Sequence, residues 1–167
     1  MPRISKIDPE HVDAATKTAI DAHLAEGYHL TNEKLTLLHN VPAFKALEES
    51  SYALDRECQR LFGKQAADFF EYAISVENGC VVCTTYFSNL LREKGIKFDE
   101  FQFTKEEQLL IDYARAIAKD PKHVPDELFK RLHETFTEEQ IVAITTMGVL
   151  MIANNYLNDV LEVEPAE

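Results

Sequence analysis

Residues 68–94 read DFFEYAISVENGCVVCTTYFSNLLREK, and this stretch decides the fold. Its first part carries apolar residues at helical spacing and predicts a helix over 66–76. An Asn-Gly pair at 78–79 ends that helix, and a second helix is predicted from about 80 to 94, with a glycine directly after it as the stop signal. The stretch therefore predicts two apolar helices joined by a tight turn, with a C-x-x-C motif at the start of the second helix.

The C-x-x-C motif places Cys80 and Cys83 on the first turn of a helix. The unpaired backbone N–H groups and the helix dipole stabilise a thiolate there, which lowers a cysteine pKa below its reference of about 8.5. The spacing also puts both sulfurs on one face, close enough to form a disulfide. Burial against apolar neighbours such as Phe87 raises a thiol pKa, and the sequence leaves open which effect is larger. The pattern favours a redox-active dithiol.

Three other readings of the cysteine pair compete with redox chemistry. A zinc site would need Cys58 and a distant histidine, because no histidine lies within 68–94. The pair could also be two inert core thiols, or a permanent disulfide, although so short a loop removes little chain entropy. Cys58 lies on the apolar stripe of a helix predicted over 43–62. It is expected to be a core thiol, with a resolving or regulatory role as the alternative.

Composition bounds the class of protein. The 167 residues fit a single domain over 1–167, with an N-terminal helical extension (1–30) and a flexible tail (163–167). The net charge of −12 disfavours binding to nucleic acid or to an anionic membrane. The N-terminal stretch lacks the apolar core of a secretory signal, and the apolar run 141–153 is too short to span a bilayer. Three cysteines in such a chain fit a reducing compartment, so a cytoplasmic location is expected.

The remaining segments also predict helices. Residues 8–10 (Asp-Pro-Glu) predict a helix start, with Asp8 as the N-cap. Residues 104–107 and 137–140 are capping boxes that open two later helices. The last helix, expected over about 137–161, is apolar nearly all round, which predicts burial in the core or in a subunit interface. No stretch alternates convincingly as a strand does, so the fold class is all-α, with about seven to eight helices.

The two helices and the motif between them resemble the carboxymuconolactone decarboxylase-like superfamily and, within it, the alkylhydroperoxidase-D-like (AhpD-like) branch. The resemblance extends to 38–61 and to 103–161. It implies the AhpD-like helical fold and a homo-oligomer, such as a dimer, trimer or hexamer. No cofactor and no metal ion are expected.

The resemblance also implies roles for individual residues. In the peroxidase branch the second cysteine, here Cys83, attacks the peroxide, although Cys80 is nearer the helix start and has the better dipole argument. A histidine usually stands four residues after the second cysteine, where this chain has Phe87. A glutamate often stands twelve residues before the first cysteine, where this chain has Asp68. Asp68 or Glu71, one turn later, is the expected proton acceptor.

The leading hypothesis is a thiol–disulfide oxidoreductase or a weak alkylhydroperoxidase-like antioxidant protein. Its oxidant would be a peroxide or a protein disulfide, and its thiol reductant is not identified by the sequence. Because phenylalanine carries no proton, the loss of the histidine favours an alternative: a non-catalytic oligomeric scaffold or binding protein on the same fold, with a vestigial dithiol. A third hypothesis, decarboxylation of a lactone acid, rests on the superfamily name alone.

Overall fold

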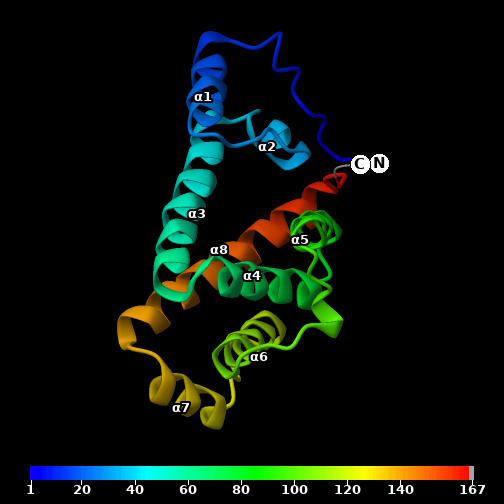
Figure 1. Cartoon of the computed structure of the whole chain (residues 1–167). Helices are drawn as coiled ribbons and strands as arrows, with labels where there is room; N and C mark the ends of the chain where they lie inside the picture. The colour runs from blue at the N-terminus through cyan, green and yellow to red at the C-terminus, as the bar shows by residue number, and fades with distance from the viewer. Residues whose placement is uncertain (166–167) are drawn as a thin grey trace.

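A central helix, α4 (Lys64–Asn78), organises the packing of the chain. The computed structural model describes residues 1–165 and contains, within them, eight α-helices and one short 3₁₀ turn (Figure 1). The all-α prediction is confirmed. The other elements are α1 (Ala14–Ala25), α2 (Asn32–Leu37), α3 (Val41–Phe62), α5 (Val81–Glu93), η1 (Phe98–Glu100), α6 (Lys105–Lys119), α7 (Asp126–Thr135) and α8 (Glu138–Leu161).

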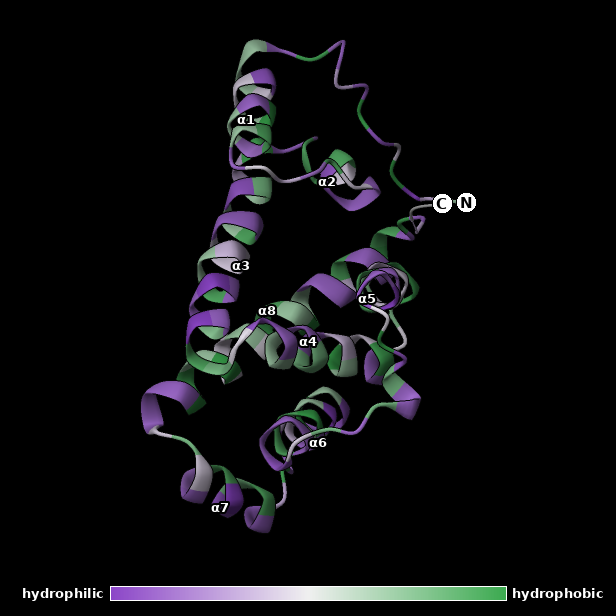
Figure 2. Cartoon of the chain, viewed as in Figure 1, coloured by the Kyte–Doolittle hydropathy of each residue, from purple (hydrophilic) through white to green (hydrophobic). Residues whose placement is uncertain are grey.

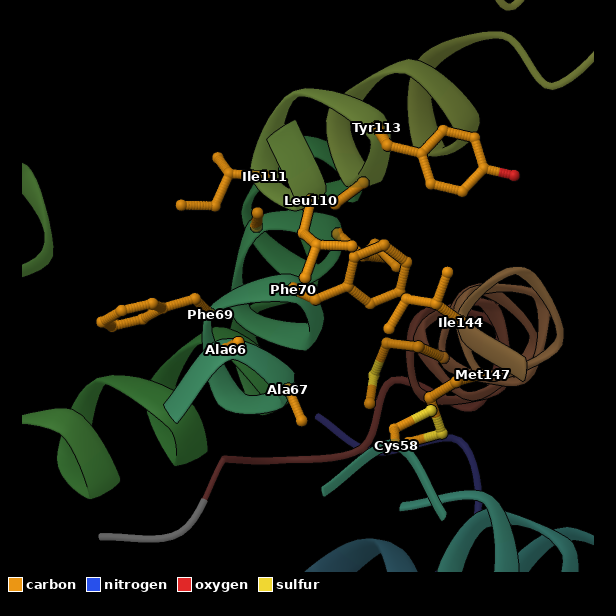
Figure 3. Packing of buried hydrophobic residues seen from close by; sticks show 14 of the residues in the cluster. Cys58, Ala66, Ala67, Phe69, Phe70, Leu110, Ile111, Tyr113, Ile144 and Met147 are labelled. Carbon is orange, nitrogen blue, oxygen red and sulfur yellow. The ribbon is translucent and has the colours of Figure 1, made fainter. Parts of the chain in front are cut away.

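The main core forms where α4 meets α3, α6 and α8. Phe70 of α4 is fully buried, and its ring lies between the side chains of Leu110 on α6 and Ile144 on α8 (Figure 3). Gly148 of α8 lets the helices approach closely at this crossing, because a β-carbon there would lie 2.5 Å from the terminal methyl group of Ile117 and would displace that side chain. Cys58 of α3 belongs to the same core and is fully buried, as expected for a core thiol.

The ends of the predicted helices follow local signals. Both predicted capping boxes are present, at Thr104 with Glu107 and at Thr137 with Gln140. Gly79 adopts a left-handed conformation, φ 71°, and so turns the chain from α4 into α5. The helix expected over residues 66–76 is confirmed as α4, which is two residues longer at each end.

The helix start predicted at Asp8 is wrong. The side chain of Asp8 instead accepts a hydrogen bond from the backbone N–H of Glu10 within a turn. The first helix begins at Ala14, because Asp13 caps it by accepting from the N–H of Thr16 at 2.8 Å. The preceding segment runs extended, and the N–H of Ile7 donates to the carbonyl of Leu35. Residues 1–13 thus contain no helix and contact α2 at Leu35.

The two ends of the described chain lie next to each other, beyond the C-terminal end of α8 (Figure 1). The backbone N–H of Arg3 donates to the carbonyl of Leu161 at 3.0 Å. Val163 is buried, and the side-chain amide of Asn32 donates to the carbonyl of Glu164. These contacts differ from the flexible tail that we expected for 163–167, whose last two residues lie outside the described part.

Helix α8 has two unlike sides. One side supplies Ile141, Ile144 and Met147 to the core, and the other leaves a line of apolar side chains exposed at Val142, Val149, Tyr156 and Val160. By length and composition α8 is the one helix, among residues 1–165, that could cross a membrane. Core helices of other proteins reach the same length and hydropathy, and α8 supplies much of the core here. In Figure 2, α3 likewise shows hydrophilic and hydrophobic residues along its length, as a helix does that packs by one stripe.

Candidate functional site

The cysteine pair lies where α4 turns into α5. Cys80 is the N-cap of α5, and its sulfur accepts a hydrogen bond from the backbone N–H of Cys83 at 3.4 Å. Both residues are buried free thiols. The sulfur of Cys80 thus takes the position that a serine or aspartate oxygen takes in an ordinary cap, which is the arrangement that stabilises a thiolate.

The two thiols have opposite pKa shifts. The hydrogen bond from the thiol of Cys83 lowers the pKa of Cys80 most, the backbone N–H of Cys83 adds to this, and burial opposes both. The pKa of Cys83 is raised, because its proton is held in the hydrogen bond to Cys80 and because the side chain is buried. The proton between the two sulfurs is therefore held more tightly by Cys83 than by Cys80, and Cys80 is the first of the pair to ionise as pH rises.

A cavity of about 540 Å³ opens in front of Cys83. Its walls come from α2, α3, α4, α5 and α8, and Cys83, Phe87, Met147 and Met151 contribute to its apolar part. Cys80 is absent from the cavity walls and is fully buried behind Cys83. A substrate in this cavity would therefore meet the sulfur of Cys83 first.

Cys83 has a second polar neighbour, which sequence reasoning missed. The side-chain amide nitrogen of Asn158, on α8, donates to the sulfur of Cys83 at 3.3 Å and to Oε2 of Glu33 at 3.2 Å. Glu33 lies at the start of α2 and is buried, and burial raises its pKa. A buried glutamate on the polar helix start Thr31-Asn32-Glu33 carries no sequence signal that links it to a motif fifty residues later.

The two carboxyl groups predicted as proton acceptors lie in the same cavity but have different surroundings. The carboxylate of Asp68 is held between two lysines, Lys64 at 3.2 Å and Lys94. Glu71 is buried, and its Oε1 atom has no hydrogen-bond partner among the described residues. Burial, and then the negative charges of Asp55 and Asp68, raises the pKa of Glu71 well above its usual range. In residues 1–165, neither carboxyl group makes a hydrogen bond to a cysteine sulfur.

No histidine takes over the position of Phe87. His39 is exposed and bonds to the carbonyl of Ser5, and His133 is exposed on α7 beside Phe129. His29 lines the cavity, at the end near α2. No group of three or more His, Cys, Asp or Glu side chains in residues 1–165 is arranged to hold a metal ion.

Comparison with solved structures identifies the fold. The chain superimposes with a TM-score of 0.74 on an uncharacterised peroxidase-related protein from Silicibacter sp. TM1040, over 97% of this chain and 92% of that chain, at 13% sequence identity. It superimposes with a TM-score of 0.65 on a protein of unknown function from Agrobacterium tumefaciens that is described as a candidate antioxidant defence protein AhpD. That match covers 77% of this chain and 94% of the other, at 22% identity.

Comparisons at the level of sequence add nothing to this: no protein-family model and no curated protein matches the chain. The two structural matches cover 97% and 77% of this chain. The chain has the AhpD-like all-α fold of peroxidase-related proteins.

Proposed function

We propose that the chain is a thiol–disulfide oxidoreductase in which Cys83 attacks the substrate and Cys80 resolves the product. The observation that carries this proposal is the position of Cys83, which lies on the cavity wall, with the sulfur of Cys80 buried behind it and hydrogen-bonded to its backbone N–H. A buried thiolate next to a thiol that faces a cavity is the arrangement that a two-cysteine exchange reaction needs.

The reaction proceeds in two displacements. The thiol of Cys83 gives its proton to the thiolate of Cys80, and the Cys83 sulfur then attacks one sulfur of a substrate disulfide, which releases the other as a thiolate. Cys80 gives this proton to the released substrate thiolate, and its own thiolate then attacks the Cys83 sulfur. The second substrate thiolate leaves, and the Cys80–Cys83 disulfide forms. An external dithiol reduces this disulfide and closes the cycle.

Phe87 favours a disulfide over a hydroperoxide as the substrate. Reduction of a hydroperoxide by Cys83 releases an alkoxide, which needs a proton at once, whereas a departing thiolate, with a pKa of about 8.5, needs none near neutral pH. Phe87 is buried, and its side chain offers no proton. A weak hydroperoxidase activity with sulfenic acid at Cys83 is therefore the secondary activity in this proposal.

Paired serine variants test the proposal. With 2-hydroxyethyl disulfide, Cys80→Ser should accumulate a mixed disulfide on Cys83, because the resolving thiol is gone, and Cys83→Ser should stay unmodified. Intact-mass measurement after acid quenching distinguishes the two. If Cys83→Ser is the variant that is trapped, the roles of the cysteines are reversed. If the wild-type protein never forms a disulfide, the non-catalytic scaffold is the better description.

The non-catalytic alternative has one observation in its favour. Three of the four residues of the exposed line on α8, Val142, Val149 and Tyr156, lie in a segment, 140–158, that contains no charged residue. We propose that a second copy of the chain covers this line, and that the homo-oligomer exists whether or not the dithiol is active. The proposed redox cycle needs a compartment that keeps thiols reduced, such as the cytoplasm.

A further inference from the structure

The cavity in front of Cys83 is rich in carboxyl groups and poor in counter-charges. Seven of its lining residues are glutamate or aspartate, and two are lysine. Both lysines are already neutralised, since Lys34 lies 3.5 Å from Glu48 and Lys64 lies 3.2 Å from Asp68. Lys94, outside the lining, also pairs with Asp68, and the other five acidic residues of the lining make no ion pair within the described residues.

Two of these acids are buried with an oxygen atom left unpartnered. Glu33 and Glu71 are 7% and 6% exposed, and Oε1 of each has no hydrogen-bond partner in the described residues. The hydroxyl of Tyr52 and Oδ1 of Asn154, which also belong to the cavity walls, are unpartnered as well. A buried polar atom without a partner costs about 1–3 kcal/mol, so these four atoms of the cavity walls have hydrogen-bonding capacity that a ligand in the cavity can use.

The missing group is a hydrogen-bond donor with a positive charge. An alkylammonium has three N–H donors and no acceptor, and it suits carboxylate oxygens, an amide oxygen and a phenol oxygen together. An anionic ligand would meet the acidic surplus at close range and be repelled. The apolar side chains around Cys83, among them Met147 and Met151, suit the hydrocarbon part of the same ligand.

We propose that this cavity binds organic ammonium ions, and that the preferred substrates of the dithiol are small disulfides that carry an ammonium group. The second half of this statement rests on the proposed function, and the first half does not. Glu33 and Glu71 hold the ammonium, and the disulfide bond then lies against Cys83. The exchange is the one described above: Cys83 forms the new S–S bond, the substrate S–S bond breaks, and one ammonium-bearing thiol leaves.

The protonation of the two glutamates fits this assignment. Burial raises the pKa of both, so that each carboxyl tends to hold its proton in the empty cavity. A bound cation stabilises the carboxylate form, and binding therefore releases protons. The affinity for an ammonium ion should increase as pH rises and the two carboxyl groups ionise, because the ligand stays charged up to its own pKa of about 10.

Three disulfides that differ in charge test the substrate class. Cystamine carries two ammonium groups, 2-hydroxyethyl disulfide is neutral, and dithiodiglycolate carries two carboxylates. The reduced protein should react fastest with cystamine and slowest with dithiodiglycolate, after each rate is divided by the rate of the same disulfide with dithiothreitol. The first two should differ by roughly tenfold or more, which is the effect of about 1.4 kcal/mol. Equal corrected rates would overturn the substrate assignment.

Variants at Glu33 and Glu71 test whether this site causes the preference for cystamine. Glu71→Gln and Glu33→Gln should each reduce the ratio of the cystamine rate to the 2-hydroxyethyl disulfide rate by several-fold. Glu77→Gln is the matched control, because Glu77 lies on the same helix as Glu71 but is exposed outside the cavity. A preference for cystamine that persists in both cavity variants would show that the overall charge of −12, and not this site, attracts the cation.

Binding without redox chemistry separates the two proposals. In the variant Cys80→Ser with Cys83→Ser, 1,4-diaminobutane should bind by titration calorimetry, with proton release, and should bind more weakly after Glu71→Gln. If the diamine binds while the wild-type thiols prove inert, the cavity assignment stands and the redox function fails. If the diamine does not bind and the three disulfides react alike, the cavity assignment fails and the redox function stands.

Discussion

The side-chain amide nitrogen of Asn158 donates to two buried groups, Oε2 of Glu33 at 3.2 Å and the sulfur of Cys83 at 3.3 Å. These three residues come from α8, α2 and α5, so one amide ties the N-terminal part of the chain to the cysteine pair. Helix α2, which comes before α4 and α5 in the sequence, is therefore part of the site in addition to covering the core.

Asn158→Ala removes the donor from both partners. Stability should decrease by about 1–3 kcal/mol, because a second oxygen of Glu33 becomes unpartnered while buried. The reaction of Cys83 with 2-hydroxyethyl disulfide should slow by up to about tenfold, because the forming thiolate loses a hydrogen bond. Urea unfolding and stopped-flow kinetics measure the two effects. Unchanged kinetics in a destabilised variant would limit Asn158 to a structural role.

The pKa of Cys80 should depend on Cys83. In the wild-type protein the Cys80 thiolate forms at lower pH than an ordinary thiol, mainly because the Cys83 thiol donates to it. Cys83→Ala removes that donor and should raise the pKa of Cys80. Cys58→Ala should leave the low-pH transition in place, because burial raises the pKa of Cys58 to about 12. Ultraviolet absorbance of the thiolate as a function of pH measures the transition in the wild-type protein and in both variants. A transition that Cys83→Ala leaves unmoved would contradict the shared proton.

Asp68→Asn should affect stability more than reactivity. The carboxylate of Asp68 is buried between Lys64 and Lys94, whose side chains are 52% and 33% exposed. Because water screens the lysines, the loss should be about 1–3 kcal/mol, less than for a fully buried ion pair. The rate at Cys83 should change less than about twofold if Asp68 has no part in proton transfer. A loss of activity at unchanged stability would instead support Asp68 as the proton acceptor.

Glu71→Gln should change how stability depends on pH. The pKa of Glu71 is raised in the folded protein, so the folded state binds more protons than the unfolded state above the unfolded pKa of about 4.3. The resulting stability is present below that pH and is lost as pH rises toward the folded pKa. Glu71→Gln removes this loss, and its advantage over the wild type should grow from about pH 5 to about pH 8. Parallel stability curves for the two proteins would contradict a raised pKa.

Val149→Glu tests the proposed contact between copies of the chain. Val149 is exposed in the middle of the line on α8, so the substitution should cost the monomer less than about 0.5 kcal/mol. A charge in a contact with a second copy should lower the sedimenting mass to that of a monomer. Glu139→Gln, at the exposed start of α8, is the control and should keep the wild-type mass. A wild-type protein that already sediments as a monomer would rule out the contact.

The features that depend on near neighbours were predictable from sequence. The Asn-Gly turn, the two capping boxes and the position of Cys80 at a helix start each depend on groups within four residues of one another. The same reasoning failed at Asp8, where two competing local caps, Asp8 and Asp13, are available. The segment before Asp8 makes a hydrogen bond from Ile7 to the distant Leu35, a contact that local sequence signals do not show.

By itself the sequence determined an all-α fold organised around a C-x-x-C at a helix start, because helix periodicity and caps act over single turns of the chain. Only the tertiary structure placed Glu33 and Asn158 beside Cys83, since Asn158 is 125 positions from Glu33 and 75 positions from Cys83 in the sequence. It also decided the opposite pKa shifts of the two cysteines, because burial and the direction of a hydrogen bond depend on where the helices pack. Polar side chains at helix starts and inner faces look alike in sequence, and the folded chain alone determines which of them become buried around one cavity.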